Sequence, residues 1–196
     1  MAESFTTEIH LGGCIPLRQV AKLCHVIHEA HVELDWGSGR FSPQGPSDLL
    51  DNRHFTADMP VLRLCDDQAC WGEFPELEQF LVRHQIPFDR FTDGKWEYAP
   101  QWLAYRPGAG LRALETNTAK EPIIPITGLD QVCARLIEMG EALKQGNHHA
   151  ALKQNRSALR SLKRLLPAPI PTLPAFDIAP TLSRDRRTTS AAPQCA

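Results

Sequence analysis

Apolar and polar positions alternate with the two-residue period of β-strands in several short stretches of the first 110 residues. Asp93-Gly94 separates two of these stretches, and an Asp-Gly step is a strong signal for a two-residue hairpin turn. The pattern therefore predicts a mostly antiparallel sheet. Its expected strands are residues 6–11, 31–36, 60–65, 87–92, 95–98 and 103–106.

Two segments between these strands instead repeat their apolar residues every three or four positions, as amphipathic helices do. Residues 17–30 form the first, and residues 75–84 form the second, which has glutamates in its first turn. The resulting order of elements predicts an α+β fold of the split βαβ, or ferredoxin-like, type with two helices on one face of the sheet and an added β-hairpin. This fold class hosts many functions and implies none.

The second half of the chain has a different pattern. Residues 127–166 repeat leucines at helical intervals on both sides of Gly146, which predicts a helical hairpin. The following residues are rich in proline and contain several arginines, so they are expected to be disordered. The expected organisation is an α+β domain at 1–110, a linker at 111–126, a helical extension at 127–166 and a disordered tail at 167–196.

The small formal net charge of −2 hides an uneven distribution. Residues 1–110 carry 16 acids and 9 Lys or Arg, a net of −7, whereas residues 111–196 carry 7 acids and 12 Lys or Arg, a net of +5. Such asymmetry indicates either a partner for the basic half or attraction between the two halves.

The N-terminal residues and the hydropathy bear on the compartment. No basic region followed by an apolar run opens the chain, and no apolar run reaches the ~20 residues of a membrane-spanning helix. A soluble, cytoplasmic protein without a membrane span is therefore expected. In that reducing compartment the six cysteines are expected to be free thiols.

Two histidines offer a candidate metal site. His25 and His28 are spaced to share one helix face, and Cys14 and Cys24 are near them in the sequence. The spacing matches no standard zinc pattern, so we favour a buried Cys24 with solvent-facing histidines. No cofactor is expected.

A cluster of acids offers a second candidate for metal chemistry. Asp66, Asp67 and Glu73 lie between an expected strand and helix, where carboxylates can bind a hard cation. A turn followed by acids at a helix N-terminus is the interpretation that we favour. The chain has no nucleophile-elbow, metalloprotease or phosphate-loop motif, so catalysis is not the leading hypothesis.

The segment 37–59 is a long, Gly- and Pro-containing excursion, which makes it a candidate binding surface. Asp48, Leu49 and Leu50 form its expected helical turn, and Trp71 lies between a strand and a helix. Tryptophan is enriched at interaction hot spots. The leading hypothesis is a non-catalytic module that binds a protein partner through these residues.

A basic stripe in the second helix of the hairpin supports a different hypothesis, an association with nucleic acid. No acid lies between Lys144 and Leu166, and the spacing places the basic residues on one side of the helix. A small metal-dependent enzyme ranks third, and the oligomeric state stays open. The stripe consists of Lys153, Arg156, Arg160, Lys163 and Arg164.

Overall fold

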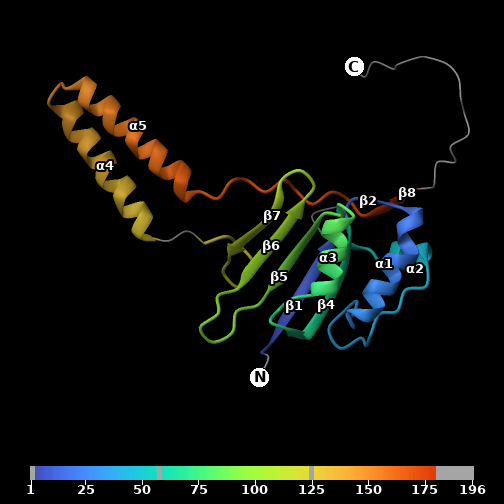
Figure 1. Ribbon diagram of the computed structural model, residues 1–196. Coiled ribbons are helices and arrows are strands. Elements are labelled where there is room, and N and C mark those ends of the chain that lie inside the picture. Colours follow the sequence, from blue (N-terminus) through green and yellow to red (C-terminus); the bar gives the residue numbers. More distant parts are fainter. Residues whose placement is uncertain (1–2, 57–58, 124–125, 180–196) are drawn as a thin grey trace, which may run out of the picture.

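The computed structural model describes residues 3–56, 59–123 and 126–179, and it contains a six-stranded antiparallel sheet, helices against that sheet, and a separate helical hairpin (Figure 1). The strands are β1 (Ser4–Leu11), β2 (Cys14–Pro16), β3 (His54–Thr56), β4 (Met59–Cys70), β5 (Phe88–Thr92), β6 (Gln101–Arg106), β7 (Gly110–Glu115) and β8 (Asp177–Ala179). The helices are α1 (Leu17–Glu29), α2 (Pro46–Asp51), α3 (Pro75–Arg83), α4 (Ile126–Lys144) and α5 (His148–Leu165).

The sheet has the strand order β3-β4-β1-β5-β6-β7, with β1 near its centre. β1 runs antiparallel to both β4 and β5, so these two strands, which α3 connects, are parallel to each other on either side of β1. The predicted α+β class with a mostly antiparallel sheet is confirmed. The ferredoxin-like assignment stays a prediction, and β6 and β7 extend the sheet beyond the β4-β1-β5 unit.

α1 and α3 cover one face of the sheet, and the hydrophobic core lies between this face and the two helices (Figure 1). Alternate residues of the strands point to this face because the side-chain period of a strand is two. The helices bury the stripe that their periodicity predicts, so the helices expected at 17–30 and 75–84 are confirmed. The core includes Ile9 and Leu11 of β1, Leu62 and Leu64 of β4, Phe88 of β5, Leu23 and Ile27 of α1, and Leu77 and Leu81 of α3.

The strand expected at 31–36 is not formed. Val32 is buried, but only Glu33 pairs with the sheet, through two backbone hydrogen bonds of 2.8 Å with Cys65. β4 in turn continues past Asp66 and Asp67, which were expected to end it, because the first residues of β1 pair with its extension as far as Cys70. A long neighbouring strand outweighs the turn preference of two aspartates.

The expected hairpin across Asp93-Gly94 is also wrong. Lys95 and Tyr98 exchange two backbone hydrogen bonds within a loop, and β5 pairs instead with β6. β6 continues through a tight turn into β7, so residues 110–115, of which all but the first were expected in a linker, are part of the sheet. A local turn signal does not show which strand pairs with β5.

Residues 167–179, which the proline content predicts to be disordered, pass along the sheet and end in β8, which pairs with β2 (Figure 1). We call residues 167–176 the strap. Phe176 at its end is fully buried in the core. Proline-rich backbone is already extended, so little conformational entropy is lost when the buried Phe176 holds it against the sheet. The rest of the expected disordered tail, 180–196, lies outside the described residues.

Gly12 and Gly13 allow the strap to approach the end of β1. A Cβ at position 12 would lie 2.2 Å from the carbonyl oxygen of Pro174, and Gly13 has a φ of +82°. The Gly13 amide donates to the carbonyl oxygens of Pro174 and Ala175, at 3.2 and 3.0 Å. Only glycine fits both conditions at this crossing.

The helical hairpin expected at 127–166 is confirmed as α4 and α5. The helices are packed closely: a Cβ at Gly128 would lie 2.1 Å from Leu165 Cδ2, and Val132 of α4 and Ala151 and Ala158 of α5 are buried. The hairpin stands apart from the sheet (Figure 1). Its outer surfaces are therefore available to other molecules.

Replacing the buried Phe176 tests whether the strap belongs to the core. Phe176→Ala should lower the free energy of unfolding by about 3–5 kcal/mol, because it removes a fully buried ring. Urea unfolding followed by circular dichroism measures this change. Phe55→Ala is the matched control, since that ring is 67% exposed, and it should change stability little. Equal stability of both variants and the unmodified protein would contradict the described packing.

Candidate functional site

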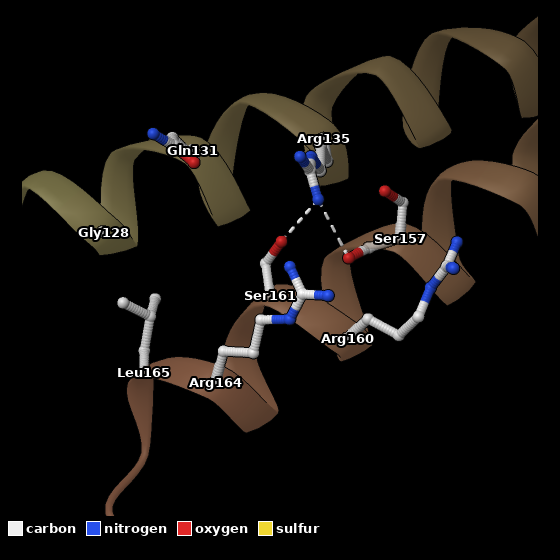
Figure 2. Close-up of a pocket in the computed structure, with 8 residues that line it drawn as sticks. All are labelled: Gly128, Gln131, Arg135, Ser157, Arg160, Ser161, Arg164 and Leu165. Atoms are coloured by element: carbon white, nitrogen blue, oxygen red, sulfur yellow. Dashed lines mark hydrogen bonds between the residues drawn. The ribbon is translucent and has the colours of Figure 1, made fainter.

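A polar cavity of about 410 Å³ lies along one flank of the helical hairpin (Figure 2). α4 and α5 both contribute to it because they run antiparallel and side by side. Figure 2 shows Arg135 reaching from α4 toward α5, with Arg160 and Arg164 on α5 beside it. The cavity is lined by Gly128, Gln131, Arg135, Ser157, Arg160, Ser161, Arg164 and Leu165.

Arg135 is held in place by α5. Its guanidinium donates to the carbonyl oxygen of Ser157 at 3.0 Å and to the hydroxyl of Ser161. Arg160 and Arg164 are exposed, and the ion pairs of the described residues include none of these three arginines. Several guanidinium donors beside serine hydroxyls make a site suited to phosphate or another oxyanion.

The structure places all five residues of the sequence-derived basic stripe on the exposed side of α5, and Arg160 and Arg164 also line the cavity. Residues 126–165 carry seven Lys or Arg and three acids, a net of +4, and α5 itself carries no acid. The alternative that this helix docks on the acidic body finds no support, since no ion pair among the described residues joins α5 to the sheet domain.

Sequence reasoning missed Arg135, Gln131, Ser157 and Ser161. A signal for them existed: in a helical hairpin, residues equally distant from the turn at Gly146 lie opposite each other, which pairs Arg135 with Ser157. The expected hairpin could thus have placed a fixed arginine beside the basic stripe. The stripe alone supported the nucleic-acid hypothesis but gave no indication of a cavity beside it.

The second face of the sheet carries a network of charged residues beneath the strap. Glu8 is 6% exposed, and the two closest Arg63 nitrogens lie 3.0 and 3.1 Å from its Oε2. Lys120 donates to the other carboxylate oxygen, and His10 Nε2 lies 3.2 Å from it. Two basic side chains from segments distant in the sequence, together with the imidazole of His10 on the same strand, therefore surround one buried carboxylate.

These neighbours decide the ionisation of Glu8. Burial alone would raise its pKa, but the close His10 imidazole and the Lys120 ammonium outweigh burial and hold the pKa of the Glu8 carboxyl well below its usual value. Glu8 therefore stays ionised at neutral pH and accepts a hydrogen bond from Lys120, which attaches the segment after β7 to the central strand. It is unsuited to serve as a general acid.

A second buried ion pair attaches the strap to the sheet. Asp89 accepts a hydrogen bond from Arg106 at 2.9 Å and one from the Trp102 indole at 3.0 Å. Arg106 also donates to the carbonyl oxygen of Pro171 at 2.8 Å. Between strap and sheet lies a largely apolar cleft of about 640 Å³, whose floor includes Phe91 and Trp102.

The residues expected to bind a protein partner are not brought together as one surface. Leu49 is fully buried in the core, so its side chain cannot contact a partner. Asp48 accepts from the Gln44 amide at 2.6 Å, and Leu50 packs partly against the core. Trp71 follows the far end of β4, beside the first residues of β1, whereas α2 contacts β8 at the opposite end. Trp71 itself is 50% exposed.

The candidate metal residues gather no further ligand. His25 is exposed, His28 contacts Ser42, and in the described part of the chain no group of three His, Cys, Asp or Glu could hold a metal ion. Asp66, Asp67 and Glu73 therefore form no such group either. Cys24 is buried, as the favoured interpretation expected.

The buried thiols are poor nucleophiles. Burial raises the pKa of Cys65 to about 11 and also raises the pKa of Cys24, so both stay protonated at neutral pH. All five cysteines of the described residues are free. The sites with distinctive chemistry are thus the hairpin cavity and the charged face beneath the strap.

Searches against protein-family models, curated proteins and solved structures found no match to this chain. Among the described residues, no helix is both long enough and apolar enough to cross a membrane.

The Glu8 network generates a pH-dependent prediction. A carboxyl whose pKa is lower in the folded than in the unfolded state stabilises the fold above the unfolded value and loses this effect as the pH falls toward the folded value. Glu8→Gln should lower the free energy of unfolding by about 2–4 kcal/mol at pH 7, because it leaves Arg63 and Lys120 without their carboxylate. The difference from the unmodified protein should shrink below about pH 4.

Urea unfolding at pH 7 and at pH 3 measures both differences. Glu97→Gln, at an exposed position, is the control and should have little effect at either pH. A Glu8→Gln penalty that is the same at both pH values would show that the network does not depend on the carboxylate charge.

Proposed function

We propose that this protein is a non-catalytic, nucleic-acid-associated module that contacts phosphates through the helical hairpin. The observation that carries the proposal is that Arg135, Arg160 and Arg164 line one cavity together with two serines. The exposed remainder of the basic stripe continues from this cavity along α5. The sheet domain, which we expect to be ferredoxin-like, serves as the scaffold.

The hairpin geometry suits a polyanion better than a single small anion. Arg135 is already oriented by α5, so little side-chain entropy is lost when it binds phosphate. α5 has 18 residues and is therefore about 27 Å long, which spans several phosphates of a nucleic-acid strand. Contacts of this kind are independent of base sequence.

We place the protein in the cytoplasm, in keeping with its free thiols. We propose no catalytic role. The described residues hold no three-ligand metal cluster, and the best-defined carboxylate, Glu8, is fully engaged by basic side chains.

Fluorescence anisotropy with mixed-sequence DNA and RNA over a salt series tests the proposal. Arg160→Ala combined with Arg164→Ala should weaken binding and reduce the slope of log affinity against log salt by about 2, because two phosphate contacts are lost. Both side chains are exposed, so the fold should be unaffected.

Arg18→Ala combined with Lys22→Ala is the matched control, since it removes two exposed basic residues from α1 of the sheet domain. This control should leave the salt slope unchanged. If the unmodified chain does not bind at low salt, or if both double variants lose affinity equally, the hairpin proposal is wrong.

A second candidate function, binding of a protein partner, is supported by the exposed aromatic residues beside the start of β1. Trp71 is half exposed, has a φ of +55° and lies edge-on to Tyr98, with ring centroids 6.4 Å apart. Tyr98 in turn contacts the buried ring of Phe5, at 5.7 Å. The indole is thus held in a fixed position at the surface, as an interaction hot spot requires.

Trp71→Ala tests this second candidate. It should reduce capture of a specific partner by tagged full-length protein, with a loss of about 2 kcal/mol or more in binding free energy. Trp36→Ala, which removes a similarly exposed indole elsewhere, is the control. Quantitative mass spectrometry of captured proteins measures the outcome, and an unchanged partner set in the Trp71 variant would refute this surface.

A further inference from the structure

The hairpin has a second surface that the proposed function does not use. Leucines recur every seven residues on both helices, and five of the six are exposed. A seven-residue leucine repeat is typical of helices that pack in left-handed bundles. We call these residues the leucine ladder. They are Leu129, Leu136 and Leu143 on α4, and Leu152, Leu159 and Leu166 on and directly after α5.

The ladder has three levels because the two helices are in register. A Cβ at Gly128 would lie 2.1 Å from Leu165 Cδ2, so antiparallel packing places Leu129 and Leu166 within one helical turn of each other along the hairpin. The seven-residue spacing then places Leu136 beside Leu159. The third level, nearest the turn, pairs Leu143 with Leu152.

The ladder lies away from the arginine cavity. One residue turns a helix by about 100°, so Leu136 lies about 100° from Arg135, and Leu159 lies about 200° from Ser157. The cavity occupies one flank of both helices (Figure 2). These rotations place the leucines on the other flank. Leu136 is 42% exposed and Leu159 is 50% exposed, so the sheet domain does not cover the ladder.

We propose that the leucine ladder binds the ladder of a second copy of this chain and forms an antiparallel four-helix bundle. A two-fold axis parallel to the helices brings each level onto the same level of the partner copy. It also places α4 of one copy on α5 of the other, with every neighbouring pair of helices antiparallel. The three levels then meet without any change of register.

Charge complementarity selects this partner and this arrangement. α4 has a net charge of −1, from three acids against Arg135 and Lys144, whereas α5 carries five basic residues and no acid. Packing α4 on α5 of a second copy places the slightly acidic helix against the basic one. Packing α5 on α5 would oppose like charges, which disfavours the other two-fold arrangement.

The size of the face is compatible with a dimer. The hairpin is about 27 Å long and about 20 Å wide, from 18 residues of helix and two helix diameters. The accessible surface of this corrugated face exceeds its projected area of ~540 Å² and approaches the ~800 Å² per partner of a standard interface. The ladder leucines line no part of the arginine cavity, so leucine substitutions test the dimer without removing a proposed phosphate contact.

The proposal is tested by measuring the molar mass of the full chain with light scattering coupled to size-exclusion chromatography. The protein concentration is varied from about 1 to about 100 µM, and the series is repeated in high salt. The unmodified protein should elute with twice the chain mass. Leu136→Glu combined with Leu159→Glu should elute with the chain mass. Leu111→Glu, at an exposed leucine of β7, is the control and should remain dimeric.

Leu136→Ala combined with Leu159→Ala separates loss of the dimer from loss of the fold, since alanine favours helix and both positions are exposed. This variant should keep its helical circular dichroism signal and raise the dimer Kd by about 100-fold or more. A monomeric unmodified chain would overturn the proposal and leave the ladder to a helix of another protein. A dimer that survives both ladder variants would overturn it as well.

Discussion

The central strand β1 must be covered on both faces, and the rest of the sheet domain is arranged to meet this constraint. Ile9 and Leu11 point to the helices, and the preceding Glu8 points to the opposite face, where it is nearly as buried. An ionised carboxylate at such a position requires cations nearby. Arg63 and Lys120 supply them from β4 and from the segment after β7.

This charged face also fixes the register of the sheet. A slip of β1 by one residue would move Glu8 into the apolar core and Ile9 away from it, which is a large penalty. The Asp89 and Arg106 pair has the same effect between β5 and β6 and binds the strap through Pro171. The buried ions therefore define one arrangement of strands, while apolar burial supplies most of the stability.

The helical hairpin is packed differently from the sheet domain. Its own core is narrow, built from small residues such as Gly128, Ala151 and Ala158, so the larger apolar side chains remain on an outer flank. The basic residues lie on other flanks of the same helices. One hairpin can thus present an oxyanion cavity and an apolar ladder at once, and neither surface depends on the sheet domain that carries it.

The sequence by itself determined the elements whose periodicity is strong: α1, α3, both helices of the hairpin, and the basic face of α5. These patterns are local, because each residue's role follows from its neighbours three or four positions away. Only the tertiary structure decided the partner of β5, the length of β4, the burial of Leu49 and the path of the strap. The same is true of the contacts of Glu8, because they join segments more than 50 and 110 residues away through ion pairs that leave no local pattern.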